Sequence, residues 1–187
     1  MKTYYFLSLV SLFMLCSCTP KKDLTSARWE LCHITGFPSQ EEGMENGVSA
    51  CYAGALGGKL IMAGGCNFPD VPASDGGKKK FYAADITADS VLNWRMVGEL
   101  PFASAYGVAT VYNDRLICAG GTDGTRSLTD VFSVRLKEDA WNTVIRSSRL
   151  ARAGAVLVSG GNDSFYNING ELKPGIRTPE ITRILLK

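Results

Sequence analysis

The sequence contains very little histidine, because His33 is the only one among 187 residues. A single imidazole excludes metal sites built from two or three histidines, and it leaves a Ser-His-Asp triad only one candidate base. An excess of charge of one sign is also lacking, since 20 basic side chains are matched by 18 acidic ones. A nucleic-acid-binding surface needs a strong basic excess, so we expect no nucleic-acid partner.

Long hydrophobic runs and paired cysteine motifs are lacking as well. The apolar run of residues 4–15 is shorter than the roughly 20 residues that cross a bilayer as a helix. The six cysteines include no C-x-x-C pair, so no metal site built on thiolates is expected. Cys32, Cys51, Cys66 and Cys118 lie among apolar or small residues. We interpret them as small buried side chains and leave disulfide pairing open.

Glycine, in contrast, is abundant at 20 residues, while the aromatic fraction is 10%. This composition favours a turn-rich, all-β chain over a helical bundle. The length allows one domain of ordinary size and leaves no room for two large ones.

The N-terminal segment resembles a bacterial lipoprotein signal. Lys2 precedes the apolar run, which ends at Leu15-Cys16-Ser17-Cys18. The resemblance implies that residues 1–17 are a signal peptide and that Cys18 is acylated. It places the protein in the bacterial cell envelope, at the periplasm or outer membrane, with membrane contact only through the lipid anchor. A plain secretory signal is the alternative.

The remaining chain divides into residues 18–27, a polar tether, and residues 28–187, one folded domain. Two stretches of this domain repeat the same features in the same order: a strand of small residues, a two-residue turn, and an apolar strand that ends in a double glycine. The stretches are residues 52–65 and 107–121, with turns at Gly57-Gly58 and Asn113-Asp114. A third strand and then a tryptophan, Trp94 or Trp141, follow each stretch.

Residues 154–185 repeat this order in part and stop before a tryptophan strand. Residues 27–32, which include Trp29, precede the first full repeat, so we expect them to supply the fourth strand of the last unit. A period near 50 residues with four strands per unit resembles the kelch repeat, the blade of a β-propeller. An all-β sandwich is the alternative fold.

The third repeat carries a distinctive loop. Where the first two repeats have Gly-Gly, we align Gly170-Glu171, followed by Lys173, Pro174-Gly175 and Arg177. Pro-Gly suits the centre of a type II turn. From the residues alone, the loop is either a binding or acid–base site or an ordinary cluster of surface ion pairs.

Residues 169–178, together with residues 65–70 and 105–108, resemble the cyclically permuted, kelch-type N-acetylneuraminate (sialic acid) mutarotases, also called epimerases. The resemblance implies a partial propeller whose substrate is an acidic sugar and whose acid–base chemistry needs no metal or organic cofactor. It implies that Glu171 and Arg177 are catalytic, with Glu171 as proton acceptor. Lys173, Asn67 and Tyr106 become candidate substrate contacts. Arginine and lysine suit the carboxylate of such a sugar.

Other functions remain open or are excluded. A non-catalytic kelch lipoprotein that binds a glycan or a protein is the alternative function. Kelch-type oxidase chemistry is excluded, because its copper site needs more histidine than His33 supplies.

The resembled family has six blades, and this sequence supplies about three four-stranded ones. We expect the absent blades to be internal, near residues 142–150, and an open arc to expose apolar surface. Three outcomes remain open: a homodimer that completes one ring, a poorly stable inactive remnant, or an incomplete copy of the sequence. The last two are favoured, because ring closure by two copies needs complementary edges.

Overall fold

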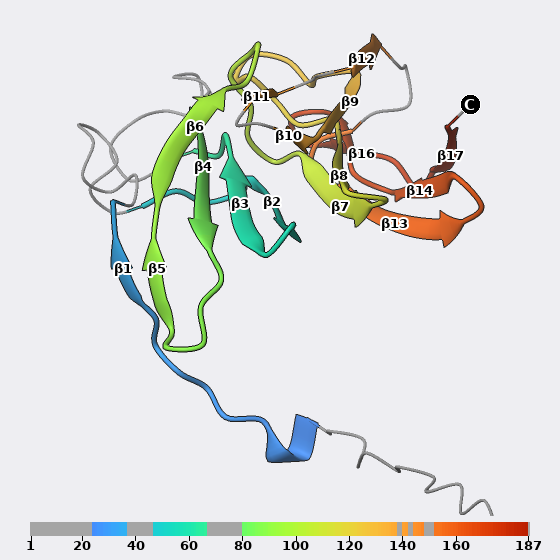
Figure 1. The fold of residues 1–187 in the computed structure, drawn as a ribbon. Helices are drawn as coiled ribbons and strands as arrows, with labels where there is room; N and C mark the ends of the chain where they lie inside the picture. Colours follow the sequence, from blue (N-terminus) through green and yellow to red (C-terminus); the bar gives the residue numbers. More distant parts are fainter. Residues whose placement is uncertain are drawn as a thin grey trace, which may run out of the picture. The chain divides into compact units, whose positions relative to one another are not determined.

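The computed structural model describes residues 24–36, 47–66, 80–137, 140–141, 144–147 and 152–186. The chain divides into two compact units, residues 1–30 and residues 31–187. Among the described residues, the first unit contains one 3-10 turn, η1 (Leu24–Ser26), and the second contains strands throughout (Figure 1). No helix in the described ranges has the length and apolar character needed to cross a membrane. The prediction of an all-β chain is confirmed.

The first sheet has four antiparallel strands in the order β2-β3-β4-β6 (Figure 1). Its strands are β2 (Tyr52–Leu56), β3 (Lys59–Ala63), β4 (Lys80–Asp85) and β6 (Arg95–Glu99). Gly57 and Gly58 join β2 to β3 with φ values of 58° and 74°. Two consecutive left-handed residues make the tight hairpin that the glycine pair predicts, because such a turn matches the twist of the strands.

The second sheet repeats this order as β7-β8-β9-β12. Its strands are β7 (Val108–Tyr112), β8 (Arg115–Ala119), β9 (Asp130–Val134) and β12 (Val144–Ser147). Trp141 lies in a small hairpin of β10 (Leu136–Lys137) and β11 (Ala140–Trp141), just before β12. The predicted junction at residues 142–150 therefore contains the strand that completes the second sheet, and its other residues lie outside the described ranges.

The third sheet has three described strands, in the order β13-β14-β17. They are β13 (Val156–Gly161), β14 (Ser164–Ile168) and β17 (Ile181–Leu185). A short hairpin, β15 (Glu171–Lys173) and β16 (Ile176–Arg177), lies between β14 and β17 in the chain. The three sheets confirm the prediction of a partial propeller of about three blades.

The prediction that residues 27–32 form a strand of the last blade is wrong. Those residues have no strand conformation, and Trp29 is 96% exposed. The next residues form β1 (His33–Thr35), which pairs in parallel with β5 (Val91–Asn93). At the start of β1, the His33 N–H donates a hydrogen bond to the Ser90 carbonyl at 3.0 Å.

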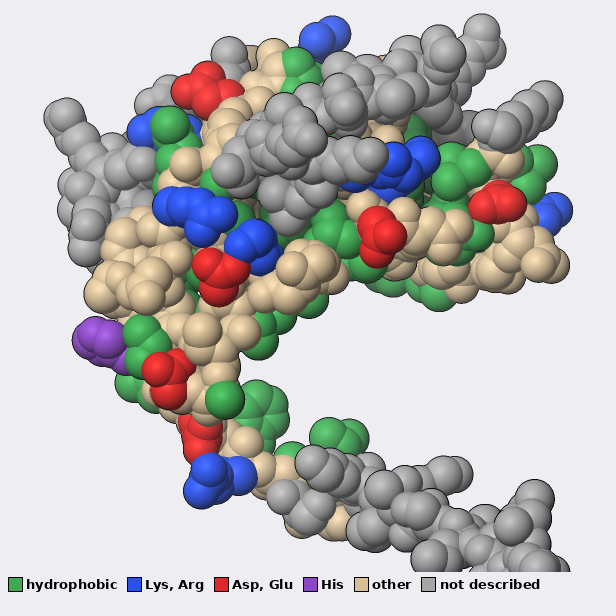
Figure 2. Space-filling view, viewed as in Figure 1, with side chains coloured by type: hydrophobic (Ala, Val, Ile, Leu, Met, Phe, Trp, Pro, Cys, Tyr) green, Lys and Arg blue, Asp and Glu red, His purple; other side chains and the backbone are tan. Residues whose placement is uncertain are grey.

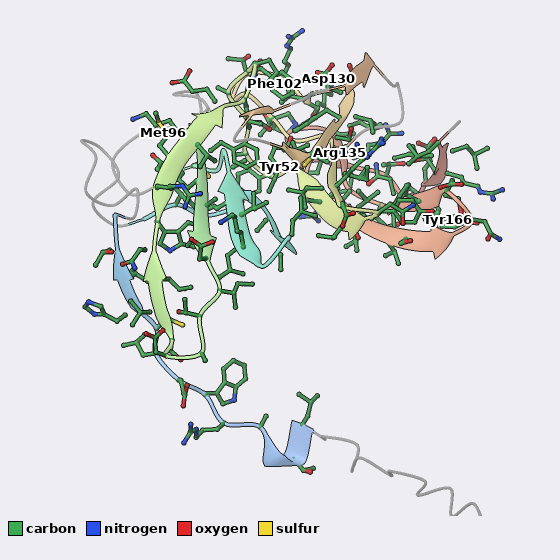
Figure 3. All side chains as sticks on the ribbon, viewed as in Figure 1. Tyr52, Met96, Phe102, Asp130, Arg135 and Tyr166 are labelled. Atoms are coloured by element: carbon green, nitrogen blue, oxygen red, sulfur yellow. The ribbon has the colours of Figure 1, made fainter. Side chains whose placement is uncertain are left out.

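The core lies between neighbouring sheets, and β8 is buried on both faces. Successive strand residues point to opposite faces of a sheet. Leu116 and Cys118 accordingly join a cluster with Tyr52, whereas Ile117 packs with Phe165. Tyr52 lies between the first and second sheets (Figure 3), where its hydroxyl donates to the Gly120 carbonyl at 2.5 Å.

The four described cysteines carry free thiols. Cys66 and Cys118 are buried as predicted, and Cys51 is partly buried. Cys32 is exposed, so its predicted burial is wrong. It precedes β1, whose residues are themselves exposed.

The third sheet is buried on one face and open on the other. Phe165 is fully buried against the second sheet, whereas Tyr166, the next residue of β14, is 36% exposed. Exposed apolar side chains share the open face with Tyr166, and Figure 2 shows hydrophobic side chains on the surface in this region. These are Val156, Val158, Ile181 and Leu185.

Candidate functional site

Each of the three sheets turns a similar corner after its second strand. Two consecutive residues there adopt left-handed backbone conformations, with φ near 60° at the first and near 100° at the second. The pairs are Gly64-Gly65, Gly120-Gly121 and Asn169-Gly170. Our alignment of Gly170-Glu171 with the double glycines is therefore wrong by one residue. Asparagine can replace the first glycine because it tolerates the left-handed region better than most residues.

The residue that follows each corner occupies an equivalent position in the three sheets. Cys66, Thr122 and Glu171 each form an antiparallel bridge with the segment that opens their own sheet. All three line one pocket of about 460 Å³. A volume of this size suits a small-molecule ligand. The repeat therefore places a thiol, a hydroxyl and a carboxylate at equivalent positions around one pocket.

The opening segments of the three sheets are also linked to one another. Ala50, Tyr106 and Gly154 have φ values of 55°, 57° and 59°. The Tyr106 N–H donates to the Ala50 carbonyl at 2.8 Å, and the Gly154 N–H donates to the Tyr106 carbonyl at 2.7 Å. Through these two hydrogen bonds, the backbone of Tyr106 links the opening segments of the first and third sheets. They fix Tyr106 in the wall of the pocket.

Glu171 and Arg177 face each other across the hairpin of β15 and β16. They are direct partners in the strand register, and Arg177 Nε lies 4.0 Å from Glu171 Oε1. The turn between them has Gly175 at a φ of 79°, as the Pro-Gly pair predicts for a type II turn. The Gly175 N–H also donates to Glu171 Oε2 at 3.3 Å. The turn thus holds the carboxylate on the pocket side of the hairpin.

The two charged side chains differ in exposure. The Glu171 side chain is 33% exposed and that of Arg177 is 88% exposed, and both line the pocket. An exposed ion pair contributes little to stability. The guanidinium is consequently available to a ligand anion, while the carboxylate is partly sheltered.

An ion pair between a buried arginine and an exposed glutamate anchors the base of this hairpin. The Arg152 side chain is 5% exposed, and its Nη2 lies 2.5 Å from Glu180 Oε2. The Arg152 carbonyl accepts the Gly121 N–H at 3.0 Å, and the Thr178 N–H donates to the Gly170 carbonyl at 3.0 Å. The hairpin is therefore tied both to its own sheet and to the second sheet.

Tyr106 brings a phenol to the same pocket. Desolvation raises the pKa of Tyr106 above its usual value, and the neighbouring Cys66 thiol adds to the rise. The phenol therefore stays protonated at neutral pH and can donate a hydrogen bond.

The structure brings together three of the predicted site residues: Glu171, Arg177 and Tyr106. Lys173 is exposed on the same hairpin and is not part of the described pocket lining. Asn67 and the lipidation candidate Cys18 lie outside the described residues.

Sequence reasoning missed Cys66, Thr122 and Asn169 as pocket residues. A one-residue shift in the repeat alignment would have found all three, because it places the first two at the position of Glu171. Asparagine in a glycine position was the available signal for that shift.

The described residues contain no group of three or more His, Cys, Asp or Glu side chains that could hold a metal ion. The polar groups of the pocket lining are a carboxylate, a guanidinium, a phenol, a thiol, a side-chain amide and the hydroxyls of Thr122 and Ser127. A carboxylate can exchange protons with a bound ligand, and a guanidinium can hold an anion with two parallel hydrogen bonds.

Repeated sheets with double-glycine corners around one pocket define a kelch-type β-propeller. A solved structure described as "Structure of YjhT" shares this fold, with a TM-score of 0.60 and 18% sequence identity. The match covers 73% of this chain and 48% of that one.

The sequence assigns the chain to one family within this class. The family model of N-acetylneuraminate epimerase matches residues 18–140, so the chain belongs to that family. The N-acetylneuraminate epimerase of Pasteurella multocida (strain Pm70) is 34% identical over 110 residues, which are 52% of this chain and 28% of that protein. The N-acetylneuraminate epimerase of Escherichia coli O1:K1 / APEC is 33% identical over 103 residues, which are 50% of this chain and 28% of that protein.

These matches therefore span less than a third of the length of the curated relatives. The family-model match includes Tyr106 and ends before the Glu171–Arg177 hairpin. Assignments of function to the hairpin rest on its own residues and on the pocket that it lines.

Proposed function

We propose that this protein interconverts the anomers of N-acetylneuraminate, or of a related acidic sugar, by acid–base catalysis. One observation carries the proposal: Glu171 and Arg177 are cross-strand partners that line a pocket in a member of the N-acetylneuraminate epimerase family. A carboxylate and a guanidinium at this spacing match the two needs of the reaction, proton transfer and the binding of an anion.

In the proposed reaction, Glu171 accepts the proton of the anomeric hydroxyl while the bond between the anomeric carbon and the ring oxygen breaks. The protonated Glu171 then delivers this proton, directly or through a water molecule, to the ring oxygen, and the open keto form results. Rotation about the adjacent carbon–carbon bond followed by reclosure gives the other anomer, and the protons return by the reverse path. The net reaction transfers no electrons and leaves no proton behind.

Arg177 binds the sugar carboxylate in this scheme, and its high exposure leaves the guanidinium accessible to a ligand. Tyr106 donates a hydrogen bond to a substrate oxygen, because its phenol stays protonated. Lys173, at the tip of the same hairpin, adds positive charge that attracts the anionic substrate.

The test follows anomer exchange of freshly dissolved N-acetylneuraminate by proton NMR. Wild-type protein should accelerate exchange, and Glu171→Gln should reduce the enzymatic rate about 100-fold or more, because an amide cannot accept the proton. Glu99→Gln, at an exposed position on the first sheet, is the matched control and should retain wild-type activity. Equal rates for wild type and Glu171→Gln would reject the enzymatic proposal.

We further propose that Cys18 is acylated and anchors the protein in the bacterial envelope. The proposal rests on the N-terminal sequence that ends at Leu15-Cys16-Ser17-Cys18. Labelled palmitate should be incorporated into the wild-type protein and not into Cys18→Ser. Incorporation into both would reject the assignment.

A further inference from the structure

We infer that Asp123 is a positioning residue for substrate binding, which holds the loop of residues 122–127 in shape as a wall of the pocket. This inference rests on the proposed function, and it concerns a different part of the pocket from the Glu171–Arg177 hairpin. The loop connects β8 to β9 and contributes Thr122, Gly124 and Ser127 to the lining.

The Asp123 carboxylate is the centre of the hydrogen bonds in this loop. Its Oδ1 accepts the N–H groups of Thr125 and Arg126, both at 2.9 Å, and the Thr125 hydroxyl at 2.7 Å. Its Oδ2 accepts Arg126 Nε at 3.2 Å. One side chain thus satisfies two backbone donors that no strand partner reaches.

Thr122 closes the loop from the other side. Its hydroxyl donates to the Arg126 carbonyl at 2.8 Å and accepts the Gly124 N–H at 3.1 Å. Its backbone exchanges hydrogen bonds with Ala105, at 2.8 and 2.9 Å. Because Ala105 precedes Tyr106, the loop and the phenol are held by the same stretch of backbone.

The hydrogen bonds of the loop stabilise the charged form of this carboxylate. Desolvation alone would raise the pKa of Asp123, but hydrogen bonds from the Thr125 hydroxyl and from the Arg126 and Thr125 amides outweigh it and lower the pKa to about 2. A permanent acceptor therefore organises the wall, and a preformed wall saves the ordering cost that a ligand would otherwise meet.

The loop does not belong to the hairpin that carries the proton-transfer groups. Loss of its shape should weaken ligand binding and leave the chemical step unchanged. This expectation separates a positioning residue from one that takes part in proton transfer, because the first changes KM and the second changes kcat.

The experiment compares Asp123→Ala with Asp123→Asn in the full chain, using N-acetylneuraminate as the probe. Asp123→Ala should raise both KM and the calorimetric Kd about five- to tenfold, with kcat within about twofold of wild type. Asp123→Asn should remain within about twofold in all three constants, because its amide oxygen still accepts the Thr125 and Arg126 N–H groups.

Asp89→Ala is the matched control. Asp89 also supports a loop, since its Oδ1 accepts the Val91 N–H at 3.3 Å, and it lies outside the described pocket lining. Its removal should leave Kd unchanged. A similar rise in Kd for Asp89→Ala would show that general destabilisation causes the effect and would overturn the inference.

Further outcomes of these measurements distinguish a failure of this inference from a failure of the proposed function. A wild-type protein that binds the sugar without exchanging its anomers rejects the enzymatic proposal, while the Kd ratio of the variants still decides the role of Asp123. Unchanged Kd in Asp123→Ala, together with faster amide hydrogen exchange at Thr125 and Arg126, would overturn the inference even for a folded variant. A wild-type protein that does not bind the sugar overturns both.

Discussion

The second and third sheets start from the same strand order and reach different degrees of burial. In β8 of the second sheet, the neighbours Leu116 and Ile117 are both buried, each against a different sheet. In β14 of the third sheet, Phe165 is buried and its neighbour Tyr166 is exposed. The repeat therefore specifies a sheet, and the adjacent sheets determine how much of its surface becomes core.

The difference also appears at the corners. Gly120 of the second sheet lies so close to the segment that opens the third sheet that an added Cβ would come within 1.9 Å of the Arg152 carbonyl oxygen. At the equivalent position the third sheet carries Asn169, which already has a Cβ. Glycine is thus required where one sheet meets the next.

The largest effect on stability is expected from Gly120→Ala, which disturbs the contact between the second and third sheets. The clash with Arg152 and the left-handed φ of 64° should together cost more than about 3 kcal/mol in the free energy of unfolding. Gly57→Ala is the control, because its φ is also left-handed at 58° but no atom lies within 4 Å of the added Cβ. That change should cost about 1–2 kcal/mol. If urea denaturation shows similar losses in the free energy of unfolding for both variants, the close contact between the sheets at Gly120 is contradicted.

The next effect compares neighbouring residues within one strand. Leu116→Ala and Ile117→Ala should each cost about 2–5 kcal/mol, because both side chains are buried. In the third sheet, Phe165→Ala should cost about 3–5 kcal/mol and Tyr166→Ala less than about 1 kcal/mol. Urea denaturation of the four variants measures the contrast directly. A large cost for Tyr166→Ala would mean that the open face is covered in solution, by a second copy or another partner.

The smallest effect on stability is expected from Val158→Thr on the open face. The exposed position should change the free energy of unfolding by less than about 0.5 kcal/mol. Replacement of a methyl group by a hydroxyl on this apolar face should still lower the binding of a hydrophobic dye. Sedimentation velocity on both proteins shows whether the face also mediates self-association, and equal dye binding would contradict its exposure.

Much of the fold could be predicted from the sequence, because the repeat marks its strands with local signals. Gly57-Gly58 and Asn113-Asp114 specify hairpins by their own backbone preferences, and both hairpins form. The strand predicted around Trp29 failed for the opposite reason. Strand pairing depends on partners distant in the sequence, and it is the next segment, β1, that finds a partner, in β5.

The site was predictable in its charged residues and not in their neighbours. Glu171 and Arg177 lie six positions apart around a Pro-Gly turn, and a hairpin necessarily brings such residues together. Thr122 and Cys66 carry no such signal, because they reach the pocket only through the stacking of sheets. The one-residue error at Asn169 hid their equivalence to Glu171.

The hydrogen bonds from Tyr106 to Ala50 and from Gly154 to Tyr106 link each sheet only to its neighbour. Stability in such an array is a sum of nearest-neighbour terms, and an outer unit can open while the others remain folded. The third sheet, with one face uncovered, is such an outer unit, and it carries Glu171 and Arg177. A ligand bound between this hairpin and the 122–127 loop would contact both the third and the second sheet. Saturating ligand would therefore stabilise the contact between these two sheets and slow local opening of the third sheet first.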